Sequence, residues 1–292
     1  MFSGTHTALI TPFRDGQVDM DAFRALIDRQ ADAGIDGIVP VGTTGESPTL
    51  NADEHLEVIK AAVGFAAGRL KVIAGTGANS TAEAVHLTRE AERLGADGSL
   101  QVCPYYNKPS QEGLYRHFKA VADETSLPIM LYSIPGRSVI EIAVETIVRL
   151  ANDCPTISSV KEAGGSVDRV NQLVQAVPEG FEVVSGDDPL TLPFISCGAV
   201  GVVSVAANLV PDVMARLVRA CRNGSFDEAL EIQKLYYPLM SALMTLDTNP
   251  VPIKSAVALL GHCSPELRLP LAPLTAEKSA TLKKTLESFD LM

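Results

Sequence analysis

A lysine at the end of a short apolar segment is the first residue in this chain that could carry out covalent chemistry. Ile157–Val160 has little charge and runs into Lys161 and then into the pair Gly164–Gly165, a pattern typical of a strand buried on both faces and followed by a turn. Because a buried ammonium without a partner is costly, Lys161 has two interpretations. Either its stem packs at a sheet rim while its charge stays in water, or burial lowers the pKa of Lys161 and the neutral amine attacks a carbonyl group.

Hydroxyl groups on a flexible backbone follow another predicted strand. Gly42–Ser47 reads Gly-Thr-Thr-Gly-Glu-Ser, and its two glycines allow a sharp turn that presents two threonine hydroxyls and several free amides. Such an array suits a carboxylate or a phosphate, although an ordinary turn is the simpler alternative. Pro104–Pro109 contains two adjacent tyrosines. A phenol can pass a proton when it is hydrogen-bonded to another hydroxyl, or it can simply pack.

Tyr132 and Arg137 extend this set of residues. Tyr132 ends the strand that precedes the Lys161 strand, so neighbouring strands would place the two side chains next to each other. Arg137 lies on a Pro-Gly turn, where an arginine is usually a solvated charge. In an active site it could instead hold a carboxylate through two parallel hydrogen bonds. Gly186-Asp-Asp188 follows the seventh predicted strand, and the eighth strand carries Gly201–Val205.

Together these residues indicate amine catalysis. A Schiff base on Lys161, proton transfer through hydroxyls and anion binding by threonine amides and Arg137 would account for all of them. The sequence has no metal-ligand spacing, no glycine-rich nucleotide loop and no Ser-His-Asp pattern. We therefore expect neither a metal nor an organic cofactor, and the joint pattern favours a catalytic Lys161.

Eight predicted strands alternate with predicted helices and would bring these residues to one end of a sheet. This alternation predicts an α/β fold with a closed parallel (β/α)8 TIM barrel, in which active sites lie at the carboxyl ends of the strands. The alternative is an open doubly wound sheet, but Gly75-Thr-Gly77 is only a fragment of a dinucleotide-binding turn. The predicted strands span Thr7–Phe13, Gly37–Val41, Val72–Ala74, Ser99–Cys103, Pro128–Tyr132, Ile157–Lys161, Phe181–Ser185 and Val200–Ser204.

Capping residues and a change of pattern divide the chain further. Asn51 with Glu54 three residues later predicts a capping box, and Ser80 is predicted to cap the next helix. After Asn223 only helices are predicted, so we divide the chain into a catalytic barrel domain, 1–223, and a C-terminal helical domain, 224–292. This appendage either covers barrel surface or makes a subunit contact. Its predicted helices are Phe226–Leu246, Pro252–Leu260 and Ala276–Leu286.

Composition restricts the class of protein. The 292 residues are 46% hydrophobic and carry a net charge of −11, which fits a globular protein and argues against nonspecific binding to nucleic acid or anionic membranes. The start of the chain does not look like a signal peptide, and no apolar run is long enough for a transmembrane helix. Five dispersed cysteines suit a reducing cytosol without disulfides or zinc.

Six segments together resemble the dihydrodipicolinate synthase family of class I pyruvate-dependent aldolases. The likeness covers essentially the whole chain. The turn at Gly42 and the lysine strand are shared with other pyruvate aldolases, whereas the tyrosine segment and the Ile-Pro-Gly-Arg segment are more specific to the synthases. The matching segments are Gly42–Glu46, Pro104–Gly113, Leu131–Arg137, Val160–Ala163, Ser185–Asp188 and Gly201–Val205.

The resemblance implies a lyase of lysine (diaminopimelate) biosynthesis that joins pyruvate to L-aspartate 4-semialdehyde. Lys161 would form an imine with pyruvate, and Tyr132 would donate and accept the protons. Thr43 and Tyr106 would complete a proton relay, with Tyr106 reaching in from a neighbouring subunit of a homotetramer, a dimer of dimers. The resemblance further implies that substrates contact Thr44, Arg137, the backbone of Val203, and Gly186.

The resemblance also implies a place for feedback inhibition. Lysine-inhibited members bind lysine in a cleft at the dimer interface, and this chain has Pro48 and Ala52 where other residues are typical, in the second case a histidine. We therefore predict weak or absent inhibition by lysine. The residues that do match the cleft are Ser47, His55, Asn79, Glu83 and Tyr105.

Two other functions remain open at this point. Another class I pyruvate aldolase, such as a sialate or 2-keto-3-deoxy sugar-acid lyase, would share Lys161, but a polyhydroxylated sugar prefers neutral partners over Arg137. A catalytically inactive barrel that senses a ligand or organises an assembly would lack at least one of the lysine and hydroxyl groups, and all of them are present.

Overall fold

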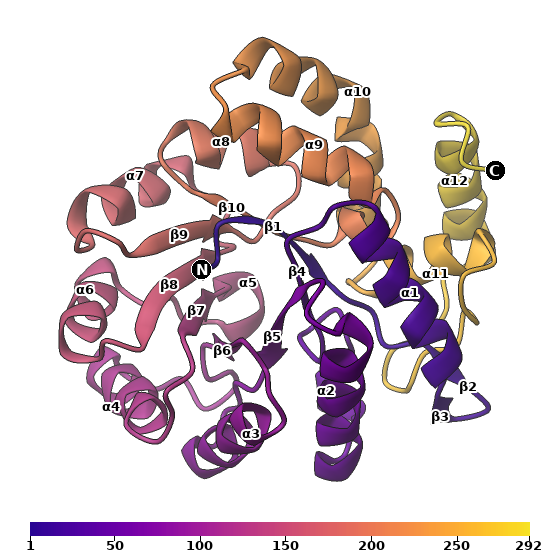
Figure 1. Ribbon diagram of the computed structural model, residues 1–292. Helices are drawn as coiled ribbons and strands as arrows, with labels where there is room; N and C mark the ends of the chain where they lie inside the picture. Colours follow the sequence, from indigo (N-terminus) through magenta and orange to yellow (C-terminus); the bar gives the residue numbers. More distant parts are fainter.

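The computed structural model, which describes residues 1–292, is a closed barrel of eight parallel strands surrounded by helices (Figure 1). Around the barrel the strands follow the order β1-β10-β9-β8-β7-β6-β5-β4, so the predicted (β/α)8 barrel is confirmed and the open sheet is excluded. The barrel strands are β1 Gly4–Ala8, β4 Gly37–Val39, β5 Lys71–Gly75, β6 Gly98–Val102, β7 Ile129–Ser133, β8 Ile157–Glu162, β9 Glu182–Ser185 and β10 Gly201–Ser204.

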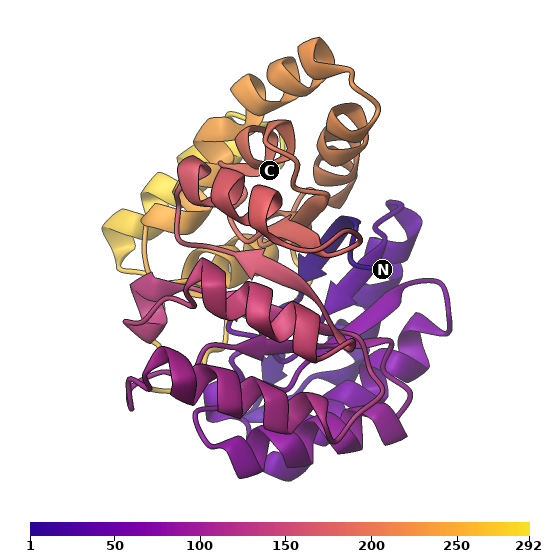
Figure 2. The same cartoon turned by 90° about the vertical axis from the view of Figure 1, so that its left-hand side faces the viewer.

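Helices cover the outside of the barrel, as the turned view in Figure 2 shows. Almost every strand residue is buried, because side chains fill the inside of the barrel while helices cover its outer face. The α-helices up to the last barrel unit are α1 Met20–Asp32, α2 Ala52–Ala66, α3 Thr81–Arg93, α4 Gln111–Ala122, α5 Pro135–Ser138, α6 Val144–Asp153, α7 Val167–Ala176, α8 Thr191–Ser196 and α9 Pro211–Arg222.

The first strand differs from its prediction, Thr7–Phe13. It begins at Gly4 and ends at Ala8, where it pairs with β10 on one side and β4 on the other. The polar sequence Gly-Thr-His-Thr does not look like a buried strand, yet closure of the barrel buries all of it. Phe13 instead belongs to a small antiparallel hairpin, β2 Phe13–Arg14 and β3 Gln17–Val18.

The capping predictions had different outcomes. Asn51 and Glu54 form the predicted capping box at the start of α2. Ser80 occupies the predicted N-cap position of α3, but its side chain makes no capping hydrogen bond. The Pro-Gly turn that carries Arg137 is one turn of helix, α5, because Pro135 occupies the first helical position, where its missing N–H is not needed. Short 3-10 turns occur at η1 Ser47–Thr49 and η2 Ala206–Asn208.

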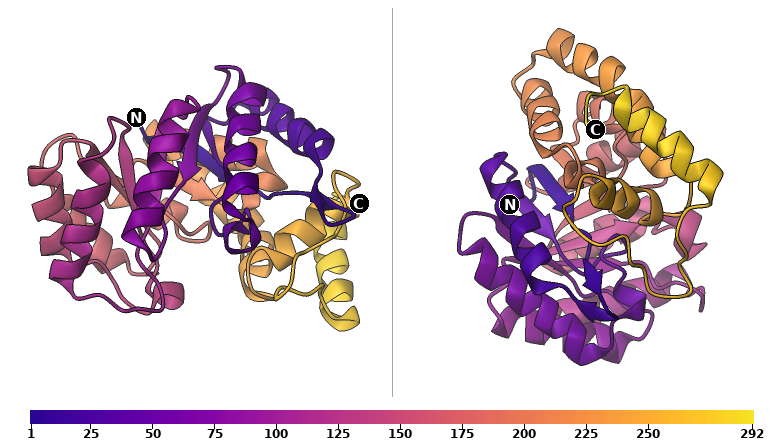
Figure 3. Two further views of the ribbon diagram at one scale, coloured as in Figure 1. Left: turned by 90° about the horizontal axis from the view of Figure 1, so that it is seen from below. Right: turned by 90° about the vertical axis from the view of Figure 1, so that its right-hand side faces the viewer.

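Three helices follow the barrel and pack on one side of it (Figure 3). They are α10 Phe226–Thr245, α11 Val251–Leu259 and α12 Ala276–Glu287. Their buried residues join those of the barrel in one continuous apolar core, which includes Leu239, Ile253 and Leu282. None of the helices in the chain has an apolar stretch long enough to cross a bilayer.

Candidate active site

Lys161 and Tyr132 lie next to each other near the carboxyl ends of β8 and β7. The two strands pair in parallel with Tyr132 opposite Lys161, so both side chains point to the same face of the barrel wall. The Lys161 Nζ lies 4.1 Å from the centre of the Tyr132 ring. The structure therefore brings a candidate nucleophile and a candidate proton donor into direct contact.

The environment of Lys161 suits a nucleophilic amine. Only 6% of its surface is exposed, and no carboxylate forms an ion pair with it. Burial lowers the pKa of Lys161 to about 8, a shift to which the positive charge of Arg137 adds and which Asp188 opposes. Near neutral pH an appreciable fraction of this amine is uncharged, as attack on a carbonyl group requires.

Tyr132 is suited to hold a proton rather than to lose it. Burial raises the pKa of its phenol to about 12, although the positive charge of Arg137 and the nearby Thr43 side chain pull the pKa in the opposite direction. The phenol therefore keeps its proton at neutral pH, and the Thr43 hydroxyl lies where it can exchange protons with it.

The two threonines lie on a tightly constrained turn after β4. Gly45 packs against the backbone of Val41, and a Cβ at Gly45 would lie 2.9 Å from the Val41 nitrogen. Thr11 ties the turn to the loop after β1 through a 2.7 Å hydrogen bond from its hydroxyl to the Gly45 carbonyl. The Thr44 hydroxyl is buried and accepts a 3.0 Å hydrogen bond from the side chain of Asn249.

Arg137 is directed toward the same turn from α5. Its guanidinium donates a 2.9 Å hydrogen bond to the Asn249 carbonyl, which fixes one side of the planar group and leaves other N–H donors free for a ligand. Asn249 therefore contacts both Thr44 and Arg137. Sequence reasoning did not identify Asn249, because it lies more than a hundred residues from either partner and in the helical appendage.

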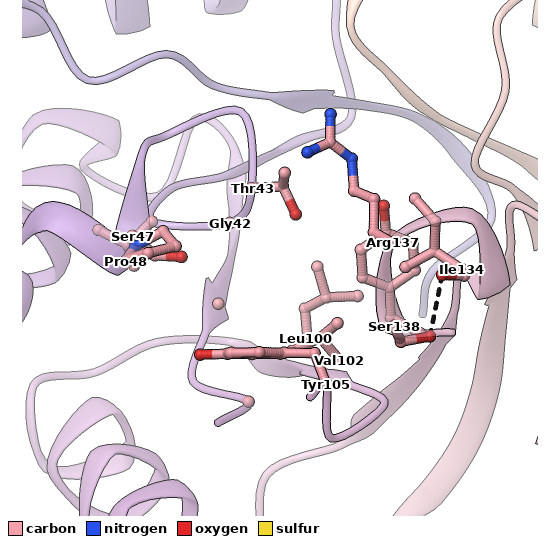
Figure 4. A pocket seen from close by; sticks show the side chains of 14 residues that line it. Gly42, Thr43, Ser47, Pro48, Leu100, Val102, Tyr105, Ile134, Arg137 and Ser138 are labelled. Carbon is pink, nitrogen blue, oxygen red and sulfur yellow. Dashed lines mark hydrogen bonds between the residues drawn. The ribbon is translucent and has the colours of Figure 1, made fainter. Parts of the chain in front are cut away.

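Thr43, Tyr132 and Arg137 line one cavity of about 220 Å³. Figure 4 shows Thr43 and the Arg137 side chain at one end of it, while Tyr105 extends toward the side where Ser47 and Pro48 lie. The remaining lining is largely apolar or glycine. A volume of this order accommodates a small molecule of few atoms. Further lining residues are Val41, Gly42, Gly75, Gly77, Leu100, Val102, Ile134 and Ser138.

Gly186 and Val203 lie on the other side of Lys161. Gly186 follows β9, and a Cβ there would approach the Lys161 Cε to 2.9 Å, so glycine leaves room for the lysine stem. Val203 is buried in β10. Nearby Asp188 accepts hydrogen bonds from the amides of Val205 and Ala206, at 2.9 and 2.8 Å. Burial raises the pKa of Asp188 to about 6. The sequence pattern assigned no role to this residue.

Tyr106 does not reach this cavity within one chain. It is 89% exposed and has a left-handed backbone with φ of 74°, an uncommon conformation for an aromatic residue. Any part that Tyr106 plays in the proton relay therefore requires a second chain or a movement of its loop.

The residues predicted to form a lysine cleft fall into two groups. Ser47 and Tyr105 line the cavity, and the Asn79 side chain donates a 3.3 Å hydrogen bond to the Tyr105 carbonyl. Glu83 is close enough to raise the pKa of the Tyr105 phenol, although burial contributes more. His55 is buried, and its Nε2 lies 2.8 Å from the carbonyl oxygen of Gly75 at the end of β5.

A parallel barrel with a buried lysine and a tyrosine side by side at the carboxyl ends of adjacent strands has the arrangement of an enzyme that forms an imine with a carbonyl substrate. The particular family follows from comparison with known proteins. The model of the dihydrodipicolinate synthetase family matches residues 1–289, and the chain belongs to this family.

Similar proteins agree over the whole length of the chain. A 4-hydroxy-tetrahydrodipicolinate synthase from Endomicrobium trichonymphae is 50% identical and covers 100% of both chains. The crystal structure of dihydrodipicolinate synthase from Aquifex aeolicus has a TM-score of 0.98 at 49% identity and covers 99% of both chains. The synthase of Methylacidiphilum fumariolicum SolV, 54% identical, also has a TM-score of 0.98 and covers 99% of this chain and 96% of its own.

Proposed function

We propose that this protein condenses pyruvate with L-aspartate 4-semialdehyde through a Schiff base on Lys161, which yields 4-hydroxy-tetrahydrodipicolinate for lysine (diaminopimelate) biosynthesis. The main support for the proposal is the position of Lys161, which is buried with its Nζ against the Tyr132 ring. Membership in the dihydrodipicolinate synthetase family supports the choice of substrates.

The chemistry begins with the neutral amine of Lys161. Its Nζ forms a bond to the keto carbon of pyruvate and water leaves, which gives an iminium. Loss of a proton from the pyruvate methyl group produces an enamine, and that carbon bonds to the aldehyde carbon of the second substrate. The substrate's own amino group then attacks the iminium carbon and displaces Lys161, so the ring closes and the enzyme is regenerated. One water is released per product.

The surrounding residues have separate tasks in this proposal. Tyr132 passes protons to and from the imine, with Thr43 next in the relay and Tyr106 of a neighbouring chain at its outer end. Thr44 binds the pyruvate carboxylate, and Arg137 holds the semialdehyde carboxylate. Gly186 and the backbone of Val203 contact the substrates.

We propose further that the protein is a cytosolic homotetramer, a dimer of dimers, that needs no metal or organic cofactor. The exposed, strained Tyr106 supports assembly, since a contact between chains would bury it. The five free cysteines support a reducing compartment. Dialysis against a chelator should leave turnover unchanged, whereas dilution to monomers should reduce it.

The deciding experiment measures turnover of pyruvate and aspartate semialdehyde, coupled to dihydrodipicolinate reductase and read as NADPH oxidation, for wild type and Lys161→Ala. Turnover by the wild type that is lost in the variant would support the reaction and the role of Lys161. No turnover by well-folded wild type would refute the synthase. If borohydride still traps pyruvate on Lys161 in that case, a sugar-acid lyase becomes the hypothesis to test.

A further inference from the structure

A second fully buried lysine, Lys254 in α11, joins the C-terminal helices to the turn that carries Thr43 and Thr44. Its Nζ lies 2.6 Å from Oε1 of Glu46, and less than 2% of either side chain is exposed. The other carboxylate oxygen of Glu46 accepts a 3.1 Å hydrogen bond from the backbone N–H of Arg268. The charge of Glu46 is therefore satisfied entirely by residues of the appendage.

An aromatic ring and a second ion pair enclose this contact. The Lys254 Nζ lies 4.1 Å from the centre of the Phe13 ring, and the Arg268 guanidinium lies 4.4 Å from the same centre. Arg268 also donates two hydrogen bonds to the Glu54 carboxylate, at 2.7 and 2.9 Å. The Glu46 contact is thus held inside a packed layer and is shielded from salt and water.

Glu46 transmits this contact to the active-site turn through its backbone. Its φ of 55° lies in the left-handed region, which costs about 1 kcal/mol or more in a residue other than glycine and persists only where neighbouring groups enforce it. The Glu46 N–H donates a 3.1 Å hydrogen bond to the Thr43 carbonyl. A shift of Glu46 would therefore move Thr43 directly.

The same appendage segment holds the neighbouring threonine. Asn249, five residues before Lys254, donates a hydrogen bond to the Thr44 hydroxyl. Fixing a helix against a barrel needs only apolar packing, and a buried ion pair is often no more stable than an apolar replacement. The geometry here instead points to a positioning role, because Glu46 is held at both carboxylate oxygens and lies within the turn that carries Thr43 and Thr44.

We propose that Lys254 is a positioning residue of the active site, which holds the Thr43–Thr44 turn in its reactive geometry through Glu46. This inference rests on the proposed function, because Thr43 and Thr44 matter only if they serve the proton relay and the pyruvate carboxylate. It also makes the C-terminal helices part of the catalytic machinery rather than a cover.

The test compares three variants with wild type at a temperature where all are folded. Lys254→Met removes the charge and keeps the length of the side chain. Glu46→Gln combined with Lys254→Met also removes the stranded carboxylate, so this pair should fold even if the single variant does not. Lys278→Met is the matched control, because Lys278 pairs with Asp247 in the same appendage, at a partly exposed site.

The measurements are kcat, the KM for each substrate, the thermal midpoint, and borohydride trapping of pyruvate on Lys161. We expect a pyruvate KM at least tenfold higher and a lower kcat in Lys254→Met and in the double variant, with the semialdehyde KM changed less. Lys278→Met should stay within twofold of wild type.

Two results would count against the inference without affecting the proposed function. One is a folded double variant with wild-type kcat and pyruvate KM, and the other is a loss of thermal midpoint alone, which marks a purely structural ion pair. Failure of wild type itself to trap pyruvate would instead refute the proposed function, on which the inference depends.

Discussion

Lys161 and Lys254 are both buried lysines, but their neighbours differ. Lys254 touches the Glu46 carboxylate at 2.6 Å, whereas Lys161 has no carboxylate in contact and lies near the positive Arg137. Burial lowers the pKa of both side chains, and a carboxylate opposes that shift in each case, Glu46 at Lys254 and Asp188 at Lys161. Only Lys254 forms an ion pair with its carboxylate. Burial alone therefore does not make a lysine a nucleophile; a direct ion pair makes Lys254 an anchor, and its absence leaves the amine of Lys161 available.

Exchanging each lysine for methionine separates the two roles most strongly. Lys161→Met should lower turnover by at least about 1,000-fold, because no imine can form. It should also stabilise the fold at neutral pH, since a pKa lowered from 10.5 to about 8 corresponds to roughly 3 kcal/mol of penalty. Lys254→Met should destabilise the fold, by about 3–5 kcal/mol, because it strands the buried Glu46.

The sign of the Lys161 effect follows from proton linkage. Between pH 8 and 10.5 the unfolded chain binds a proton at this site that the folded chain does not bind. Unfolding is therefore favoured progressively as the pH falls through that range, and the penalty is complete below pH 8. The difference between the thermal midpoints of wild type and Lys161→Met, compared at pH 7 and at pH 10, measures this destabilisation by the buried Lys161 charge. Equal midpoints of the two proteins at pH 7 would show that burial does not penalise this charge.

Removing the positive neighbour of Lys161 gives the next largest effect. Arg137→Ala should raise the KM for aspartate semialdehyde by about ten- to a hundredfold, because charge-assisted, bidentate hydrogen bonds to the substrate carboxylate are lost. Pyruvate trapping on Lys161 should survive, with its pH dependence displaced to higher pH because Arg137 lowers the Lys161 pKa. Initial rates with each substrate varied would test this, and an unchanged semialdehyde KM would contradict the role of Arg137.

The pH dependence of imine formation reports the pKa of Lys161 directly, in a protein in which Lys161 itself is not mutated. Only the neutral amine reacts, so the trapping rate should rise about tenfold per pH unit below pH 8 and level off above it. Asp188→Asn should move this profile to lower pH, because the Asp188 charge raises the Lys161 pKa. A wild-type profile that rises only above pH 10 would mean that Lys161 is an ordinary solvated lysine.

The smallest expected effect concerns lysine as an inhibitor. Pro48 lines the active-site cavity beside Ser47, and Ala52 begins α2 without a side chain that could bind an amino acid. Added lysine should therefore change the initial rate less than about twofold at modest concentration, since the two substitutions remove polar contacts. Replacing Ala52 by His is the matched gain-of-function variant. Strong inhibition of the wild type would contradict this prediction.

Local sequence patterns were sufficient for most of the fold and for the chemical character of the site. Apolar strands that alternate with amphipathic helices predicted seven of the barrel strands to within a few residues, because a strand buried on both faces is usually apolar. β1 was misplaced because its Thr and His side chains are buried only when the barrel closes around them. Strand ends on a barrel meet at one rim, so the sequence pattern alone groups Lys161, Tyr132, Thr43, Thr44 and Arg137 together.

Short-range order along the chain is enough to specify which reactive groups the protein carries and which end of the barrel presents them. How those groups are tuned and held depends on contacts made only in the folded barrel. Strand pairing in the barrel places Tyr132 opposite Lys161. Burial inside the same barrel lowers the pKa of Lys161. The contacts of Asn249 and Lys254 with the threonine turn join residues about two hundred positions apart, and no local pattern encodes such a pairing.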